Sequence, residues 1–409
     1  MAVKVALEFL ALSACASLRK VALMIVTGLP LALGACNFLG TGISNDSTSA
    51  PVPKVHLEPL AGGTLVGERV GTGPVLVGAI LPLTQNGGPS VVGQSLRNAA
   101  QLAVEESGSN DITLIIEDDH STPDGAAQAA QTAISAGAEI IVGPLFAANV
   151  REVGRAAKAA NRPVIAFSTD ASVASRGVYL LSFLIESYVD RITDFAVARG
   201  LKSFAILAPQ NDYGNVATAE FQSEAARLNA RIATVARYAP GEPASGIQAL
   251  DGAADPIDAL FIPEQADGIV AVASALSASG RKTQILGTGV WNDARVLQLP
   301  GLQGAWFAAP ENAGFAAFAQ RYKAKFSSDP TRLATLSYDA VSLVSALSRT
   351  QGAQRFSDAA LTNASGFNGA DGVFRFKSDG QNERGLAVMQ IEHGATTLLS
   401  PAPHSFVGG

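Results

Sequence analysis

The fold is decided by the stretch VLVGAILPLTQNGGPSVVGQSLRNAAQLAVEESGSNDITLIIE at residues 75–117. Its two ends, 75–81 and 112–117, are short runs of mainly aliphatic residues, and the segment 95–107 between them places Ala, Leu and Val at helical spacing. Strands that are apolar on both faces are typical of parallel sheets covered by helices. The stretch therefore predicts a strand, a crossover helix and a second, parallel strand.

The same alternation continues along most of the chain. Helix and strand patterns follow at 124–137, 139–143, 149–161 and 163–167, and a second series follows at 188–200, 203–208, 215–229, 231–238, 258–263, 267–280 and 283–287. A chain of 409 residues is long enough for two domains, because single cores stop growing near about 250–300 residues. We therefore predict an α/β protein with two doubly wound lobes.

The last third of the chain fits neither series. It contains strand patterns at 305–310, 372–380, 385–394 and 396–400, and helical patterns at 314–326 and 333–349. A return to the first lobe and one more crossing would explain this order, and together they predict a hinge of several strands. The resulting division assigns 74–186 and about 310–381 to lobe I, about 187–309 and 382–400 to lobe II, and 401–409 to a tail.

The composition indicates a globular protein that does not bind nucleic acid. Hydrophobic residues make up 48% of the chain and charged residues 16%, so large cores can form. The formal net charge is −6, whereas nucleic-acid binding requires a basic face. The two cysteines, Cys15 and Cys36, both precede the predicted lobes, which excludes a disulfide or a cysteine-based zinc site there.

The N-terminus carries the pattern of an export signal, residues 1–36. A basic pair at 19–20 precedes an apolar run that is too short and too interrupted for a membrane span of about 20 residues. The run ends in LGAC at 33–36, which resembles the lipobox of bacterial lipoproteins, in which the cysteine, here Cys36, receives the lipid. The alternative is an ordinary signal with a chance cysteine, and a second, less regular match lies at 12–15.

The segment 37–73 is predicted to be a flexible tether, because it is rich in Gly, Ser, Thr and Pro and lacks periodicity. Retention at the inner membrane usually involves an Asp after the lipidated cysteine, and this chain has Asn37, which favours the outer membrane. We therefore expect a periplasmic protein that is attached to a bacterial membrane through its lipid anchor only.

An ordered set of motifs gives the chain a family resemblance. They are VGAILPLT (77–84), VGQSLRNAAQLAVEE (92–106), IIEDDHSTPDGAAQAAQ (115–131), AEIIVGPLFAANV (138–150), RPVIAFSTDASVASRGVYLLSF (162–183) and LAPQNDYGNVATAEFQ (207–222). The set resembles the type I periplasmic binding proteins of the leucine/isoleucine/valine-binding family from Val75 to about Gly394, and is closest to the lipoproteins called penicillin-binding protein activators.

The resemblance implies two Rossmann-like lobes that close on a hinge, and it implies two alternative functions. One is capture of a small polar solute, such as an amino acid, an amide or a peptide-like compound, for an ABC permease. The other is regulation of a peptidoglycan synthase. The shared fold does not choose between them.

In lobe I, candidate ligand contacts lie where strands end and helices begin. Backbone amides at Ala147 and Ala148 follow the strand pattern at 139–143 and could hold an anion at a helix N-terminus. The resemblance implies a carboxylate-binding serine at this position, but the chain has Ala147. Ser168 and Thr169 match a family loop that donates to the same carboxylate, although either could instead form a cap, which is the role we expect for Asp170.

In lobe II, Tyr213 matches a family tyrosine at the mouth of the cleft, with ordinary packing as the alternative. Three further residues follow predicted strands and are expected to face the same cleft: Glu264, Gln265 and Trp291. The resemblance implies an acidic partner for a ligand ammonium group at a position where this chain has Gly289 instead. Glu264 or Asp293 could take the place of that acid. An uncharged, peptide-like or anionic ligand therefore stays open.

Other constellations favour no catalytic chemistry. The triplet Asp118-Asp119-His120 could suggest a metal, but further ligands at suitable spacing are absent and capping of the next helix explains it. None of the four histidines lies beside a G-x-S-x-G motif or a reactive cysteine. We therefore expect a binding protein without enzymatic activity, cofactor or metal.

Overall fold

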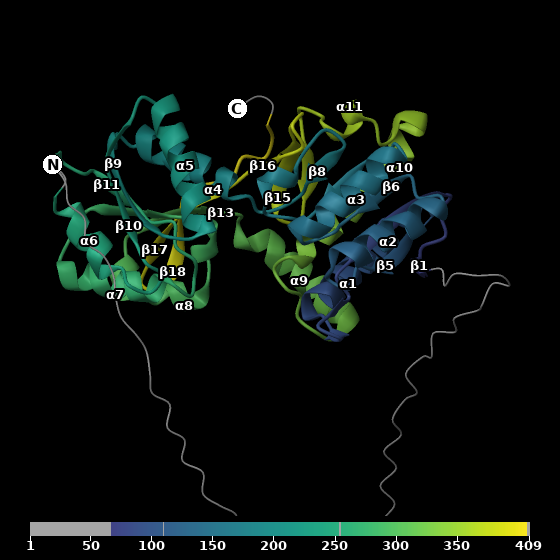
Figure 1. Ribbon diagram of the computed structural model, residues 1–409, viewed down its shortest axis with the longest axis horizontal. Coiled ribbons are helices and arrows are strands. Elements are labelled where there is room, and N and C mark those ends of the chain that lie inside the picture. The colour runs from purple at the N-terminus through teal and green to yellow at the C-terminus, as the bar shows by residue number, and fades with distance from the viewer. Residues whose placement is uncertain (1–66, 109, 253–254, 407–409) are drawn as a thin grey trace, which may run out of the picture. The chain divides into compact units, whose positions relative to one another are not determined.

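The computed structural model describes residues 67–108, 110–252 and 255–406, and everything below concerns these residues. They form two large sheets, each with helices on both faces, which define lobe I and lobe II (Figure 1). The predicted signal and lipidation site at Cys36 lie outside the described residues, and these predictions stay untested.

Lobe I is built on a six-stranded sheet in which all neighbours except the first pair run parallel. Its strands, in spatial order, are β1 (Glu68–Val70), β5 (Ile112–Asp118), β2 (Val75–Leu81), β6 (Ile140–Val142), β7 (Val164–Ala166) and β8 (Val178–Leu180). The antiparallel strand β1 lies inside the segment predicted as a tether, so the ordered sheet begins earlier than the sequence indicated. A short hairpin, β3 (Thr84–Gln85) and β4 (Gly88–Pro89), follows β2.

Helices cover both faces of this sheet, as its apolar strands require. The helices α1 (Val91–Glu106) and α10 (Ala334–Thr350) share one core cluster with the strands, and α2 (Pro123–Ser135) and α3 (Ala147–Ala159) share another on the opposite face. The helix α9 (Asn312–Phe326) packs on α1. A small antiparallel sheet completes lobe I: β14 (Phe367–Gly369), β15 (Gly372–Phe376) and β16 (Asn382–Arg384).

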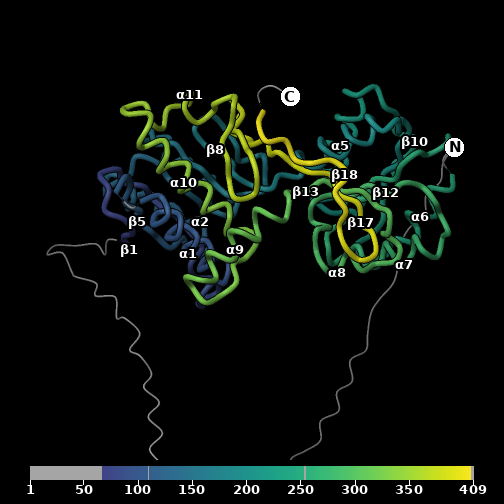
Figure 2. The backbone as a smooth tube through the Cα atoms, turned by 180° about the vertical axis from the view of Figure 1, so that it is seen from behind, coloured from purple at the N-terminus to yellow at the C-terminus, as the bar shows by residue number. Residues whose placement is uncertain are grey.

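Lobe II repeats the architecture around a seven-stranded sheet. Its spatial order is β10 (Arg231–Tyr238), β9 (Ser203–Pro209), β11 (Ala259–Phe261), β12 (Gln284–Gly287), β13 (Trp306–Ala309), β17 (Ala387–Glu392) and β18 (Ala395–Ser400). The first five strands run parallel, and the last two join antiparallel beside β13. Figure 2 shows the two C-terminal strands, β17 and β18, side by side in yellow.

The helices of lobe II also divide between two faces. One face carries α4 (Ile185–Ala198) and α5 (Asp212–Arg227), and the other carries α6 (Ala244–Leu250), α7 (Ile269–Ser279) and α8 (Ala294–Leu297). Short helical turns complete the two lobes: η1 (Ala171–Val173), η2 (Gly289–Trp291), η3 (Pro300–Leu302), η4 (Gly352–Gln354) and the one-turn helix α11 (Asp358–Leu361).

The chain passes between the two sheets in three places, which form the hinge. They lie between β8 and α4, between β13 and α9, and between β16 and β17. Residues 382–384, which the sequence placed in lobe II, pair with β15, so the last crossing lies three residues later than expected. Phe183, in the first crossing, packs against core residues of both lobes.

The C-terminal segment 401–406 leaves β18 and returns to lobe I. The backbone N–H of Ala402 donates to Oε1 of Glu311 at 2.9 Å, at the second crossing. The guanidinium of Arg375 in β15 lies 4.6 Å from the centre of the Phe406 ring. The end of the described chain is therefore attached to the small sheet of lobe I.

Candidate ligand-binding site

In lobe I, the predicted ligand loops lie together at the carboxyl ends of β6 and β7. The two strands are parallel neighbours, and the backbone N–H of Phe167 donates to the carbonyl oxygen of Pro144 at 2.9 Å. This bond links the loop before α3 to the loop that contains Ser168 and Thr169. Both loops occupy the edge of the sheet where ligands bind in open α/β folds.

The N-terminus of α3 is available for an anion. Phe146 is the N-cap residue, and its side chain cannot cap the amides that follow. Ala147 is partly buried and Ala148 is exposed, while the buried side chain of Asn149 donates to Asp119 Oδ2 at 2.8 Å. The first amides of a helix and its dipole favour a negative group at this position.

In the loop after β7, some polar side chains form hydrogen bonds within the loop and others are exposed to solvent. The Ser168 side chain is buried, and its Oγ accepts a hydrogen bond from the backbone N–H of Asp170 at 3.1 Å. Thr169 is exposed. Asp170 caps η1 by accepting from the Ser172 backbone at 3.0 Å, which confirms the capping role expected for it. Hydrogen bonds from Ser172 and the positive charge of Arg151 lower the pKa of Asp170.

In lobe II, Tyr213 is the second residue of α5 and reaches across to the loop after β12. Its hydroxyl lies 2.6 Å from Oγ1 of Thr288, which is fully buried. Burial raises the pKa of the Tyr213 phenol, so this group stays protonated at neutral pH. The contact fixes the position of the ring and joins two of the loops that the sequence assigned to the cleft.

Glu264 is committed to a structural network. Only 5% of the residue is exposed, and its Oε2 accepts from the Tyr238 hydroxyl at 2.6 Å. Its Oε1 accepts from the backbone N–H of Gln265 at 2.8 Å. A carboxylate held in this way is not free to pair with a ligand ammonium group, whereas the neighbouring Gln265 side chain is exposed.

Trp291 belongs to the core of lobe II, which differs from the ligand contact that the sequence predicted. Its side chain has no solvent exposure, and its indole N–H donates to the carbonyl oxygen of Glu264 at 2.9 Å. The ring lies on Gly287, where a Cβ atom would be 2.2 Å from ring carbon Cε3. The large apolar surface of the indole explains why it turns inward rather than toward a ligand.

The resemblance implies an acid at Gly289, but an aromatic ring occupies the space where a side chain at this position would lie. A Cβ atom at Gly289 would lie 2.3 Å from Cε1 of Tyr188 in α4 and 2.9 Å from the carbonyl oxygen of Ala308. The alternative acid, Asp293, caps α8 and forms an ion pair with Arg295 at 2.8 Å. Neither Asp293 nor Glu264 therefore offers a free carboxylate at this loop.

A polar cluster at the hinge was not found by sequence reasoning. Arg384 is 5% exposed, donates from Nε to the carbonyl oxygen of Ser182 at 2.9 Å, and stacks on Phe183 at 4.6 Å. Arg332 lies on the same ring at 5.1 Å and pairs with Asp371 at 2.6 Å. These residues are separated by about 150–200 positions from Phe183, so no local pattern could have indicated their contact.

Burial dominates the electrostatics of this cluster. Desolvation lowers the pKa of Arg384 and raises the pKa of Asp339 to about 7, although their opposite charges partly compensate. The same effect raises the pKa of Tyr188 to about 12. Both terminal guanidinium nitrogens of Arg384 and Oδ2 of Asp339 are buried without a hydrogen-bond partner in the described residues.

The triplet at 118–120 forms a hydrogen-bonded turn. The Thr84 hydroxyl donates to Asp118 at 2.6 Å, and Asp119 accepts from the Ser121 backbone at 2.7 Å. The cap of α2 is Thr122 rather than either aspartate. Within the described ranges, no group of three or more His, Cys, Asp or Glu side chains could hold a metal ion.

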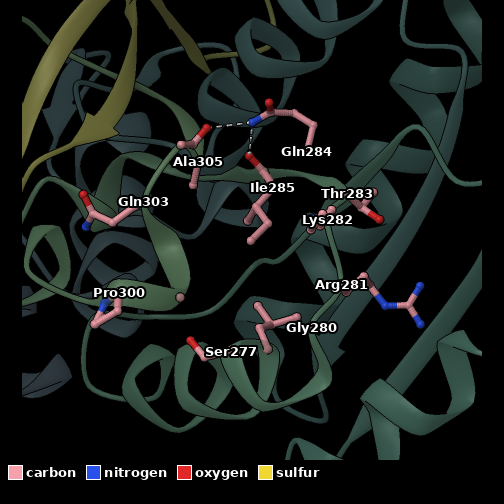
Figure 3. A pocket seen from close by; sticks show the side chains of 13 residues that line it. Ser277, Gly280, Arg281, Lys282, Thr283, Gln284, Ile285, Pro300, Gln303 and Ala305 are labelled. Atoms are coloured by element: carbon pink, nitrogen blue, oxygen red, sulfur yellow. Dashed lines mark hydrogen bonds between the residues drawn. The ribbon is translucent and has the colours of Figure 1, made fainter.

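Three cavities lie outside the set of predicted ligand residues. Their volumes are about 410, 870 and 300 Å³, and none is lined by the eight predicted ligand residues. The first lies between the end of α7, the start of β12 and η3, where the Gln284 amide donates to two carbonyl groups (Figure 3). It is therefore at the amino end of β12, opposite the edge where the candidate loops lie.

Comparisons with known proteins agree with this geometry. The family model for periplasmic binding proteins matches residues 74–396. A search of curated protein sequences found no match. Among solved structures, a protein assigned to a branched-chain amino acid ABC transporter of Rhodospirillum rubrum is 17% identical, with a TM-score of 0.70 over 80% of this chain and 99% of the other.

Two further structures were solved with ligands. The substrate-binding protein LivJ from Streptococcus pneumoniae, in complex with isoleucine, is 18% identical, with a TM-score of 0.55 over 80% of this chain and 99% of the other. A solute-binding protein from R. palustris, in complex with benzoate, is also 18% identical, with a TM-score of 0.55 over 81% and 98%. At these identities the structures show a shared fold.

The fold and the family model together define an extracytoplasmic solute-binding protein and not an enzyme. The chain belongs to the periplasmic binding protein family. None of the helices in the described part of the chain is long and apolar enough to cross a membrane.

Proposed function

We propose that the chain is a lipid-anchored solute-binding protein of an ABC-type transport system, and that its ligand is a small carboxylate or amide without a free α-ammonium group. Family membership supports solute capture. Anion-binding groups in lobe I, the amides at Ala147 and Ala148 and the hydroxyl of Thr169, support a ligand with a negative or carbonyl oxygen.

The observation that carries the proposed ligand class is the filled position at Gly289. An α-ammonium group buried without an anionic partner costs several kcal/mol, in the range of about 3–5 kcal/mol when one partner of a buried pair is missing. Tyr188 excludes an acid at Gly289, and Tyr238 and Arg295 engage the two neighbouring acids. A ligand without the ammonium group avoids this cost.

Affinity would come from closure of the hinge. Thr169 and the α3 amides belong to lobe I, while Tyr213 and Gln265 belong to lobe II, so a ligand contacts all of them only when the lobes approach. Such a ligand shifts the equilibrium toward the closed state by its difference in affinity for the two states. Phe183 packs against the cores of both lobes, so its contacts should change when the lobes move relative to each other.

The test compares ligands that differ only in the ammonium group. The fragment 67–409 would be screened by thermal shift against leucine and 4-methylpentanoate, and then against wider sets of amides, aromatic acids and short peptides. A ligand present at about 100 times its Kd adds about 2.7 kcal/mol to the folded state. We expect stabilisation by the deaminated acid class and its loss in Thr169→Val. Equal or greater stabilisation by leucine would refute the ligand class, and a flat response to every compound would refute solute capture.

Regulation of a peptidoglycan synthase is the second candidate, and one observation favours it. The position implied for a ligand serine is Ala147, and the acids of the other lobe are committed to the fold, so a ligand site could have been lost while the lobes persisted. A flat thermal-shift screen combined with specific retention of a purified synthase on the immobilised protein would support this function.

A further inference from the structure

The second of the three cavities is a basic groove on lobe I that none of the candidate ligand residues lines. It has a volume of about 870 Å³ and lies between α3, the η1–β8 segment and the η4–α11 segment. Gly154 contributes to its floor, where a Cβ atom would be 3.1 Å from Cγ2 of Val178. Its lining includes six cationic residues: Arg151, Arg155, Lys158, Arg162, Arg176 and Arg355.

These cations form a row along one wall. Arg151, Arg155 and Lys158 recur at spacings of four and three residues, so they share one face of α3, and Arg162 follows just beyond the helix. At a rise of about 1.5 Å per residue, the three helical positions alone span about 10 Å, which is the length of three residues of extended chain. Arg176 and Arg355 belong to the other walls of the groove. A row of this length suits a linear polyanion better than a point charge.

The charge of the groove is opposite to that of the whole chain. The formal net charge of the protein is −6. In the groove, four of the six cations pair with the carboxylates of Asp170, Glu152, Asp358 and Glu139, at 3.1, 2.5, 3.5 and 3.0 Å. Within the described residues, Lys158 and Arg162 have no ion-pair partner, and Nε of Arg162 is buried without a hydrogen bond. The groove therefore carries a surplus of positive charge on an acidic protein.

The two most exposed cations can exchange their partners at low cost. The side chains of Arg155 and Arg176 are 75% and 79% exposed, and ion pairs of exposed side chains contribute little to stability. Guanidinium groups bind carboxylates through two parallel hydrogen bonds, and in this groove they already bind carboxylates of the same chain. Carboxylates of a partner could replace Glu152 and Asp358 at Arg155 and Arg176 with little loss of fold stability.

We propose that this groove docks an acidic, extended segment of a partner protein. The groove is lined along α3 from Val150 to Lys158 and by Ser172 and Val173 of η1, and none of the eight candidate ligand residues lines it. Docking therefore requires no contact with those eight residues. The proposal does not depend on the identity of the solute or on its transport.

The experiment measures binding of a fluorescent hexaglutamate peptide to the fragment 67–409 by anisotropy. We expect saturable binding that weakens several-fold between 50 and 200 mM salt, because exposed charges are screened over about 10 Å at 0.1 M. Arg155→Glu combined with Lys158→Glu should weaken binding about ten-fold or more. The control, Lys323→Glu combined with Lys325→Glu on α9, makes the same change of net charge and should leave binding within about two-fold. Circular dichroism and thermal melts would verify that both variants fold.

Two competitors distinguish other sources of negative charge. Inorganic polyphosphate and vesicles containing phosphatidylglycerol would be titrated against the bound peptide. Tighter binding of either one, at equal charge concentration and with the same dependence on Arg155 and Lys158, would overturn the assignment to an acidic protein segment. Absence of peptide binding, or equal losses in the two double variants, would refute the groove as a docking site.

Discussion

Replacement of Gly289 by alanine tests whether the Tyr188 ring fills the position implied for an acid. The new Cβ atom would lie 2.3 and 2.6 Å from two carbons of that ring and 2.9 Å from the Ala308 carbonyl oxygen. Overpacking of this kind costs about 1–3 kcal/mol. The backbone of Gly289 has no positive φ, so about 0.4–1 kcal/mol would be regained from the lower entropy of the unfolded chain. We expect a net loss of about 1–2 kcal/mol.

The assay is urea unfolding of the fragment 67–409, followed in a double-mutant cycle with Tyr188→Ala. If the ring causes the cost, Gly289→Ala should cost less than about 0.5 kcal/mol once the ring is absent. The difference between the two costs is the coupling energy, and its size would be typical of residues in contact. Gly88→Ala is the control, because its Cβ atom would meet no atom closer than 3.9 Å. The reasoning would be refuted if Gly289→Ala cost the same with and without the tyrosine.

Three further predictions concern single side chains. Asp339→Asn should reduce the fall in stability between pH 5 and pH 8. The pKa of Asp339 is raised to about 7 in the folded protein, above its unfolded value near 3.8, so the contribution of this group to stability is complete below pH 3.8 and is lost as the pH rises through 7. Urea midpoints that change with pH in parallel for the variant and the parent protein would contradict this prediction. Tyr213→Phe should cost about 1–3 kcal/mol, because it leaves the buried Thr288 hydroxyl without its partner; an unchanged melting curve would count against that bond. Trp291→Phe should lower stability by about 1–3 kcal/mol through the lost bond to Glu264, without changing any ligand-induced thermal shift. If a folded Trp291→Phe protein lost its ligand-induced thermal shift, Trp291 would have to be a ligand contact after all.

The sequence predicted the fold well because the information for it is local and periodic. The run at 75–81 is buried at every position except Leu76, as expected for a central parallel strand, and it forms β2 with those bounds. The capping role of Asp170 was also predictable, because the cap bonds a residue two positions away. The start of the sheet was not, because β1 is three residues long and its pairing with β5 depends on a partner more than 40 positions along the chain.

The candidate site was harder to predict because side-chain direction depends on distant partners. Glu264 follows a strand end as expected, but Tyr238, 26 residues earlier, engages its carboxylate. Trp291 follows a strand end too, yet its ring turns into the core toward the Glu264 carbonyl oxygen. No spacing rule distinguishes an aromatic residue that faces a cleft from one that faces the core.

The attachment of the C-terminal segment to lobe I sets an upper limit on how far the hinge can swing. The five residues from 401 to 405 connect β18 of lobe II to Phe406, whose ring stacks on Arg375 of lobe I. The six steps from Ser400 to Phe406 reach at most about 22 Å when fully stretched. A wider excursion would have to break the ring contact or pull β18 from the sheet edge, so the amplitude of opening depends on the length of this short connection as well as on the three crossings.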